Sequence, residues 1–138
     1  MKNILVTGGA GFIGSNFIKF IFRYFPKIKI FNLDALTYAG SLENLREEEN
    51  KPKYEFIHGD ILNQSLVENI LAEKMIDTVV HFAAESHVDK SIHGPAAFIK
   101  TNIEGTFSVL EAIRSVTNAG QKIHFHHVST DEVFGTLS

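Results

Sequence analysis

The sequence predicts an α/β protein with a doubly wound parallel sheet that carries helices on both faces. Two observations predict this fold. Short apolar runs alternate with segments of helical periodicity along the chain, and such alternation is typical of parallel strands joined by crossover helices. The first three apolar runs also stop at glycine or aspartate, as buried strands do where they leave a sheet.

The N-terminal segment predicts a strand, a helix and a second strand. Residues 3–7 (NILVT) form an apolar run that stops at glycines, which indicates a buried strand. Residues 12–25 predict a helix that ends before Pro26. Its apolar residues at near-helical spacing are Ile13, Phe17, Phe20, Ile21 and Tyr24. Residues 29–33 predict the second strand, which ends at Asp34.

The middle of the chain predicts a third strand and a second helix. The strand covers residues 54–58, and the helix covers residues 64–74. The segment 35–53 is long for a loop and contains two leucines, so we expect a short surface helix within it. We expect the acidic run at residues 47–49 to face solvent, because charged side chains are rarely buried.

The remaining chain predicts strand, helix and strand. Residues 78–84 (TVVHFAA) predict the fourth strand. Pro95 stands where a helix can begin, since proline at the first helical position loses no needed donor. That helix should run to about residue 118 and close at Gly120. Residues 122–129 predict the fifth strand.

Composition narrows the class of protein. The 138 residues suffice for one domain with a hydrophobic core. The net charge of −3 disfavours nucleic acid or a membrane as a partner, because both favour a basic surface. The absence of cysteine excludes disulfides and thiol nucleophiles. No apolar run approaches the roughly 20 residues that span a bilayer, and no signal-peptide cleavage site is evident. We therefore expect a cytoplasmic protein.

A glycine-rich turn between the first strand and helix predicts a dinucleotide site. Residues 7–15 read TGGAGFIGS. Gly8 permits a tight turn, Gly11 lets the backbone approach a pyrophosphate, and Gly14 lets the helix pack closely. Gly9 has no separate predicted role. Free N–H groups at the helix start, at Phe12 and Ile13, would then face the phosphates. The alternative is a glycine-rich turn that binds no ligand.

Acidic residues at the next two strand ends extend this site. Asp34 lies 20 positions beyond Gly14, where a carboxylate accepts hydrogen bonds from the adenosine ribose. No arginine adjoins it to accept a 2′-phosphate, so NAD is favoured over NADP. The predicted cofactor contacts continue through Ala35, Leu36 and Thr37. Asp60 could bond the adenine amino group while Ile61 packs on the ring; alternatively, Asp60 caps the next helix. Together these motifs indicate a Rossmann-type fold.

The chain resembles the extended short-chain dehydrogenase/reductase family, and within it the dTDP-glucose 4,6-dehydratases. The resemblance rests on the glycine motif, on the pair Asp60-Ile61, on residues 83–91 (AAESHVDKS) and on residues 128–135 (VSTDEVFG). Two positions depart from the family pattern. Phe134 stands where members usually have tyrosine, so any hydrogen bond from that phenol is lost. Lys90 stands where members usually have arginine, which is a milder change.

The resemblance implies a three-step reaction on a nucleotide-sugar substrate, dTDP-glucose. A hydride passes from C4 to NAD, water is eliminated across C5 and C6, and the hydride returns to C6. By resemblance, Asp131 is the acid that protonates the leaving hydroxyl, Glu132 is the base that takes the C5 proton, and Thr130 bonds the substrate near C4. The alternative for this pair is an exposed acidic turn. The resemblance also implies a homodimer and a pathway to deoxysugars such as rhamnose for surface polysaccharides.

Residues after the fourth strand and in the long helix complete the expected site. Small residues there would let the backbone pass close to the cofactor. The expected cofactor contacts are Phe82, Ala83, Ala84, Glu85, Ser86 and Thr101, with Ser86 also meeting substrate. Asn102 resembles a structural asparagine of the family. For Thr101 and Asn102, the alternative is a bond to a nearby carbonyl of their own helix.

Two further expectations concern what the sequence lacks. The histidines at 124, 126 and 127 alternate along a strand with no carboxylate to complete a site, so we expect no metal. Family members also carry a Tyr-x-x-x-Lys pair for hydride transfer, but residues four after Tyr24, Tyr38 and Tyr54 are not lysines. We therefore expect residues 1–138 to be an incomplete NAD-binding domain, truncated before the C-terminal substrate domain, that holds NAD without turnover.

Other functions remain open at this point. Another NAD-dependent nucleotide-sugar enzyme, such as an epimerase or a decarboxylase, is one alternative. Those enzymes use hydroxyl residues where this chain has Asp131, so the triplet weighs against them. A non-catalytic NAD-binding module is a second alternative, favoured by the missing tyrosine–lysine pair and disfavoured by the adjacent acidic residues at 131 and 132.

Overall fold

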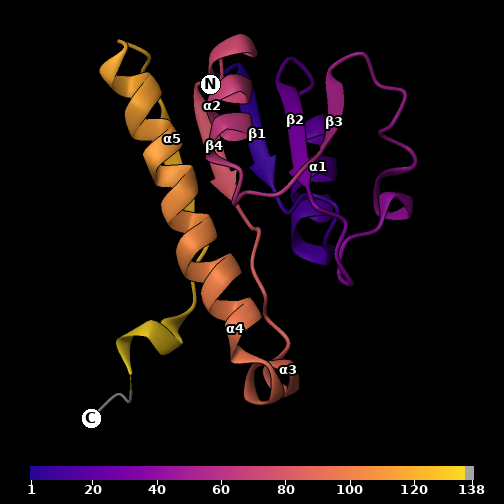
Figure 1. Cartoon of the computed structure of the whole chain (residues 1–138). Helices are drawn as coiled ribbons and strands as arrows, with labels where there is room; N and C mark the ends of the chain where they lie inside the picture. Colours follow the sequence, from indigo (N-terminus) through magenta and orange to yellow (C-terminus); the bar gives the residue numbers. More distant parts are fainter. Residues whose placement is uncertain (136–138) are drawn as a thin grey trace.

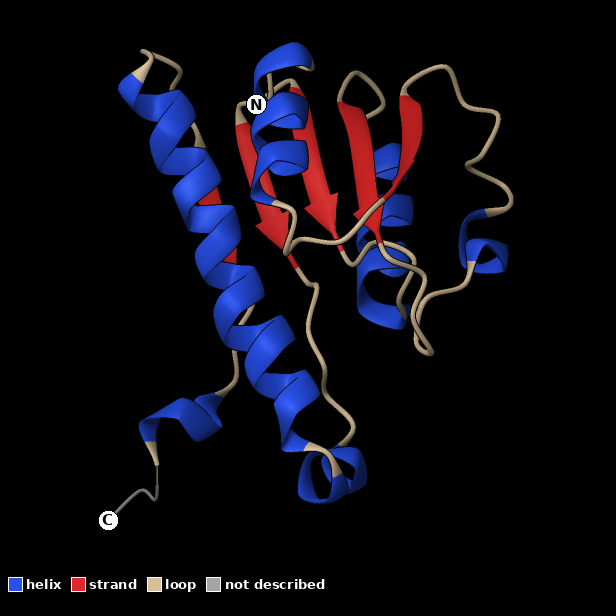
Figure 2. Cartoon of the chain, in the orientation of Figure 1, coloured by secondary structure: helices blue, strands red, loops and turns tan. Residues whose placement is uncertain are grey.

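The computed structural model describes residues 1–135, apart from the side chains of Val88, Lys90 and Glu132. It contains a parallel five-stranded sheet in the order β3-β2-β1-β4-β5, with helices on both faces (Figures 1 and 2). The strands are β1 (Asn3–Thr7), β2 (Lys29–Asp34), β3 (Tyr54–His58), β4 (Thr78–His81) and β5 (His124–His127). The predicted doubly wound α/β fold is confirmed.

The helices divide between the two faces of the sheet. The main helices are α1 (Phe12–Tyr24), α2 (Gln64–Glu73), α3 (Val88–His93), α4 (Pro95–Phe98) and α5 (Thr106–Asn118). A π-helix, η2 (Ile99–Gly105), joins α4 to α5 into one long rod, and short 3₁₀ turns occur at η1 (Leu42–Leu45) and η3 (Asp131–Phe134). The helices α2 and α5 pack together on one face, whereas α1 covers the other (Figure 1).

Two apolar cores form, one on each face of the sheet. The larger core joins strand residues such as Leu5 and Val79 to Leu71 of α2 and Val109 of α5, all with no exposed surface. The second core joins Ile4, Val6 and Ile30 to α1. Because neighbouring residues of β1 enter opposite cores, the run NILVT is buried on both faces, as a central parallel strand requires.

Helix α1 forms where predicted but presents a different face to the sheet than the spacing suggested. Ile13, Phe20 and Tyr24 are more than half exposed. The buried residues of α1 are Gly14, Ser15, Ile18, Ile21 and Phe22. The reason lies at the start of the helix, where Gly14 must face the glycine turn, and this contact fixes the rotation of the helix about its axis.

The boundaries at the far end of the sheet also differ from expectation. Strand β4 ends at His81 and β5 spans four residues, whereas both were predicted to be longer. The edge strand β5 pairs with β4 alone, so its ladder can be no longer than that of its partner. Helix α3 was not predicted. Pro95 occupies the first turn of α4, and Gly120 closes α5 with φ +99°, both as expected.

The acidic run at residues 47–49 is only partly solvated, which corrects the expectation for one residue. Glu47 and Glu49 are exposed, but Glu48 is 5% exposed and forms an ion pair with Lys51. The turn that follows η1 directs the Glu48 side chain into the protein, whereas its charge alone predicts that it faces solvent. Among the described residues, no helix is both long enough and apolar enough to cross a membrane.

Candidate functional site

The candidate residues gather where the parallel strands end. Backbone bonds continue the ladder one step beyond each strand, from Gly8 N to Leu33 O, from Gly59 N to Asp34 O and from Phe82 N to Thr7 O. All these chain exits therefore lie at the same edge of the sheet. In open α/β sheets this carboxyl edge is where ligands bind. It is the lower edge in Figure 1, toward which the strand arrows point.

Three glycines of the turn are required by the packing of the protein itself. Gly8 has φ +70°, and a Cβ there would lie 2.6 Å from Ala83 N, where β4 has just ended. A Cβ on Gly14 would collide with Gly8 O, and one on Gly9 would collide with the Asn32 side chain. The predicted roles of Gly8 and Gly14 thus match their geometry. The close approach of Gly9 to β2 was missed, and only the sheet order makes it visible.

Gly11 differs, because a Cβ there would make one close contact with the glycine turn but would collide with no atom. A Cβ there would meet Gly8 O at 3.3 Å and Ala39 O at 4.0 Å, and its φ of −74° suits any residue. Gly11 is the N-cap of α1 but offers no side chain to cap it. The first-turn N–H groups of a helix lack helical partners. The uncapped start of α1, beside Gly11, is therefore suited to accept an anion.

Asp34 holds the glycine turn in place. One carboxylate oxygen accepts a hydrogen bond from Ala10 N and the other from Leu36 N, each at 2.8 Å. The residue is 8% exposed. Leu36 adopts φ +51°, a left-handed conformation that follows from closing this small loop on the carboxylate. Asp34 therefore joins the two chain exits, and each oxygen retains a further lone pair for a ligand hydroxyl.

Beyond Asp34, segment 35–41 runs beside the turn. The predicted contacts Ala35 and Leu36 are half-buried, whereas Thr37 is exposed. Ser41 N and the Asn44 side chain both donate to Ala10 O, at 3.1 and 2.9 Å. The segment is thus fixed to the glycine turn at its far end as well as through Asp34.

Asp60 and Ile61 lie at the end of β3 with different surroundings. One Asp60 carboxylate oxygen accepts from Leu62 N at 2.9 Å, while Asn63 caps α2 by accepting from Leu66 N. The alternative that Asp60 caps α2 is therefore wrong. Ile61 is 4% exposed and packs against Gly105 of η2. Contact of Ile61 with an adenine ring remains a prediction.

A buried series of hydrogen-bonded side chains lies at the end of β4. His81 Nδ1 is 2.6 Å from Thr7 Oγ1, and His81 Nε2 is 3.0 Å from Thr106 Oγ1. Burial, and then the neighbouring His127, lower the pKa of His81 to about 4, so the ring is neutral at physiological pH. These bonds join the ends of β1 and β4 to the start of α5. The sequence patterns did not predict this role; the only signal for it is a single histidine within an otherwise apolar strand.

The loop after β4 is held from η2. Asn102 accepts a bond from Glu85 N at 2.8 Å and donates one to Glu85 O at 2.9 Å. The expected structural role of Asn102 is thus visible, and it serves another segment rather than its own helix. Thr101 is half-buried in the same turn. Of the other predicted contacts in this loop, Phe82 and Ala83 are half-buried and Ser86 is exposed.

The predicted catalytic triplet follows β5. Val128 N continues the ladder to His81 O, and Thr130 and Asp131 then lie exposed on the surface. Thr130 Oγ1 donates a bond to an Asp131 carboxylate oxygen at 3.4 Å. The backbone of Glu132 lies in η3, and its side chain is outside the described residues. Phe134 is 84% exposed.

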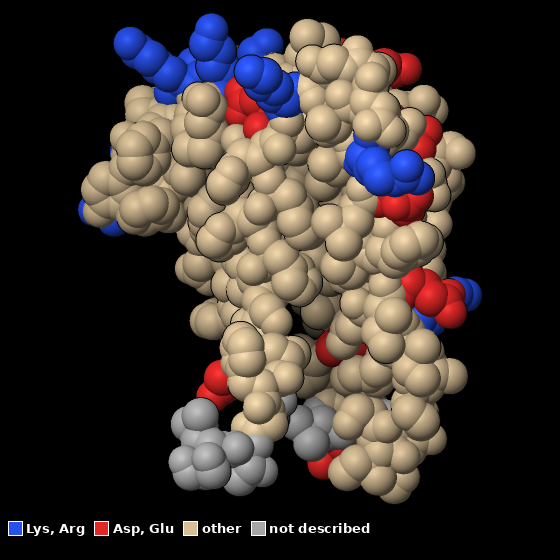
Figure 3. All heavy atoms as spheres, turned by 90° about the vertical axis from the view of Figure 1, so that its left-hand side faces the viewer, with Lys and Arg blue, Asp and Glu red and all other residues tan. Residues whose placement is uncertain are grey.

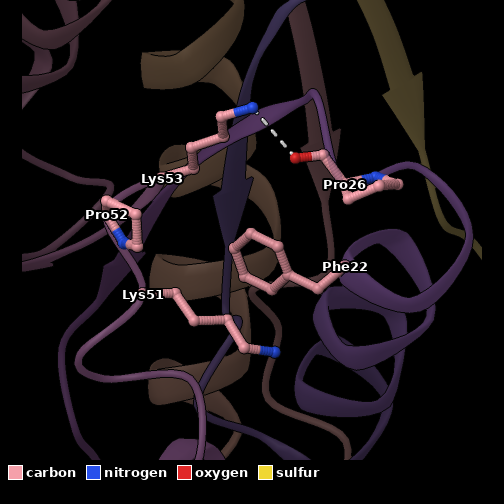
Figure 4. Close-up of a pocket in the computed structure, with 5 residues that line it drawn as sticks. All are labelled: Phe22, Pro26, Lys51, Pro52 and Lys53. Carbon is pink, nitrogen blue, oxygen red and sulfur yellow. Dashed lines mark hydrogen bonds between the residues drawn. The ribbon is translucent and has the colours of Figure 1, made fainter.

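A hollow of about 240 Å³ lies at the opposite edge of the sheet, lined by Phe22, Pro26, Lys51, Pro52 and Lys53 (Figure 4). Its lysines are engaged, since Lys53 Nζ donates to Pro26 O and Lys51 pairs with Glu48. Among the side chains that the structure describes, no group of three or more histidine or acidic residues is placed to hold a metal.

Comparisons with known proteins place the chain in a family. A model of the GDP-mannose 4,6 dehydratase family matches residues 5–138. The dTDP-glucose 4,6-dehydratase of Haemophilus influenzae is 48% identical over 143 residues, which cover 100% of this chain and 42% of the relative.

Solved structures of related enzymes have the same fold. A Streptomyces venezuelae dTDP-glucose 4,6-dehydratase with NAD bound has a TM-score of 0.86 and 44% identity, over 99% of this chain and 42% of that one. A Brucella ovis UDP-glucose 4-epimerase in complex with NAD has a TM-score of 0.84 and 30% identity, over 100% of this chain and 38% of that one.

The chain spans about two fifths of the length of these relatives. The resemblance to the dTDP-glucose 4,6-dehydratases is confirmed, since the family model, the curated relative and the fold agree. The chain belongs to the GDP-mannose 4,6 dehydratase family.

Proposed function

We propose that residues 1–138 are the NAD-binding part of a dTDP-glucose 4,6-dehydratase. The observation that carries the proposal is the contrast at the glycine turn. Gly8, Gly9 and Gly14 lack side chains because the protein occupies that space, whereas a Cβ on Gly11, beside the uncapped start of α1, would come no closer than 3.3 Å to another atom. A pyrophosphate bound there accounts for the one glycine that packing does not explain.

The other residues at the edge suit the remaining parts of NAD. Asp34 would accept the ribose hydroxyls, with Leu36 and Thr37 alongside, and Asp60 and Ile61 would adjoin the adenine. The loop after β4, from Phe82 to Ser86, and Thr101 of η2 would adjoin the nicotinamide half. Bound NAD supplies a hydride acceptor and, later in the cycle, a hydride donor.

The proposed chemistry of this chain is acid–base catalysis at the exit of β5. Glu132 would remove the C5 proton of a 4-keto sugar, and Asp131 would protonate the C6 hydroxyl, which departs as water. Thr130 and Ser86 would bond the substrate. The exposed position of Asp131 beside Thr130 Oγ1 leaves its carboxylate accessible to such a substrate. The neighbouring carboxylates would favour opposite protonation states through like-charge repulsion.

A product assay tests this proposal. Purified protein that contains this chain is incubated with dTDP-glucose and NAD, and we expect dTDP-4-keto-6-deoxyglucose, detected by mass as the loss of one water. Asp131→Asn should reduce kcat by about 10²–10⁴-fold, because it removes the general acid. Glu73→Gln, on exposed α2 surface, serves as control. A 4-epimerised sugar with no loss of water would instead identify an epimerase and refute the proposal.

Two further features belong to the proposed full-length enzyme. We propose a homodimer, since Ile99, Ile103, Phe107 and Leu110 recur at about one helical turn and are 43–63% exposed along η2 and α5. Figure 3, viewed from the α5 side, shows a broad uncharged surface below a group of basic side chains. Such a surface suits a second copy. We also propose cytoplasmic synthesis of a deoxysugar precursor for surface polysaccharides, such as rhamnose.

A further inference from the structure

Two loops meet in front of the glycine turn. The sheet order β2-β1-β4 places β1 between the strands from which these loops emerge. Tyr38 lies in the loop after β2, and residues 85–87 lie in the loop after β4. The rings of Tyr38 and His87 make an edge contact, with centroids 6.4 Å apart. Any contact between these loops must cross the carboxyl end of β1, where the glycine turn begins.

Polar interactions reinforce this crossing. The Tyr38 hydroxyl interacts with the Glu85 carboxylate and with the backbone N–H groups of Ser86 and His87. Partial desolvation, and then the negative charge of Glu85, raise the pKa of Tyr38 above its ordinary value, so the protonated phenol is favoured beside that carboxylate. The ring nevertheless stays 52% exposed, so the crossing is on the surface and not within a core.

Both loops are anchored on either side of the crossing. Ser41 N and the Asn44 side chain fix the first loop to Ala10 O. Asn102 holds the second loop through two bonds to the backbone of Glu85. Between the anchors, Ala39 O lies 4.0 Å from where a Gly11 side chain would begin. The first loop therefore forms the wall opposite the open space at Gly11.

We propose that Tyr38 and residues 85–87 form a strap across the pyrophosphate site, and that opening the strap limits how fast the dinucleotide enters and leaves. The inference rests on the proposed function, which assigns that site to NAD. The strap contacts join protein to protein, so they can exist before and after binding. Weakening them should accelerate association and dissociation by the same factor and leave the dissociation constant unchanged.

Stopped-flow fluorescence with NADH as the probe tests the strap in the protein that contains this chain. Tyr38→Phe removes the hydroxyl and keeps the ring. We expect both rate constants to rise about tenfold, as the loss of a hydrogen bond to a charged group allows. Tyr24→Phe, an exposed tyrosine at the end of α1, should change neither. Without NADH, amide exchange at Ser86 and His87 should also be faster in Tyr38→Phe.

The possible outcomes separate this inference from the proposed function. Unchanged rate constants in Tyr38→Phe would overturn the strap while leaving NAD binding intact. A faster dissociation with unchanged association would also overturn it, because Tyr38 would then be a direct ligand of the dinucleotide. If the unaltered protein bound no NADH, the proposed function itself would fail, and the strap with it. Equal acceleration of both rates, with faster amide exchange, supports the strap.

Discussion

At the scale of single residues, the glycines of the turn are required for different reasons. Gly8 adopts φ +70° against the backbone of Ala83, whereas Gly11 is extended and a Cβ there would come no closer than 3.3 Å to another atom. The same substitution at the two positions should therefore affect different properties. The residues are three apart in one turn, so each serves as the control for the other.

Gly8→Ala should lower the free energy of unfolding by about 1–3 kcal/mol, because it adds backbone strain and a collision with Ala83. Gly11→Ala should change that energy by less than about 1 kcal/mol, yet weaken NAD binding about tenfold or more by occupying the space for the pyrophosphate. Urea denaturation and calorimetry measure the two effects. Equal stability losses with unchanged NAD affinity in Gly11→Ala would contradict the assignment.

His81 makes stability depend on pH. Its pKa is about 4 in the folded protein and 6.5 in the unfolded chain, so below pH 6.5 the unfolded state binds a proton that the folded state excludes. Stability is therefore full above that pH and falls as pH drops toward 4, by up to about 3 kcal/mol.

Urea unfolding at about pH 4.5 and about pH 7.5 measures this loss. His81→Gln should remove most of the difference, since glutamine does not titrate, although the variant is less stable at both values. His124→Gln, at an exposed edge position, should retain it. A pH dependence that survives unaltered in His81→Gln would assign it to other groups.

At the scale of elements, the π-helix η2 joins α4 to α5 and places side chains of this long helix beside the candidate site. It places Gly105 against Ile61 and Asn102 against the loop after β4. Such π-helical turns are often found at functional sites. Here η2 anchors the loop after β4, whose residues we propose to contact NAD. A substitution in η2 should therefore loosen that loop before it disturbs the packing of the core.

Asn102→Ala should therefore speed amide exchange of residue 85 and cost about 1–2 kcal/mol of stability, through the loss of two hydrogen bonds. Asn102→Asp should retain one of them, the bond accepted from Glu85 N. Asn69→Ala, on exposed α2 surface, is the matched control. Exchange at residue 85 that is equally slow in all three variants would show that Asn102 does not hold the loop.

At the scale of the whole molecule, the exposed apolar residues of η2 and α5 predict self-association. Phe107→Asp should convert the proposed dimer to a monomer, measured by sedimentation, because burying an unpaired carboxylate at the contact costs several kcal/mol. Met75→Asp, at a turn where the methionine is 67% exposed, should leave the assembly unchanged. A monomer with the unaltered sequence would refute the proposed dimer.

The sequence alone determined the fold class, the order of the strands and main helices along the chain, and the chain exits at which the candidate residues lie. Hydrophobic periodicity and the glycine or aspartate after each apolar run are local signals, and they sufficed to predict where β1, β2 and β3 lie in the sequence. Local patterns gave wrong predictions where contacts with distant residues decide the structure. The length of β5, for example, is limited by its neighbour β4. The burial of Glu48 was not predicted either, because it depends on how the turn after η1 folds, although its ion-pair partner Lys51 lies only three residues away.

Only the tertiary structure distinguished the glycines and revealed the contacts between loops. The approach of Gly9 to Asn32 joins segments far apart in sequence, and so does the hydrogen-bonded series of side chains from Thr7 through His81 to Thr106. Such contacts arise from sheet order, which brings β1 between β2 and β4. Sequence spacing fixes what each segment becomes, whereas close packing between segments fixes which side chains meet.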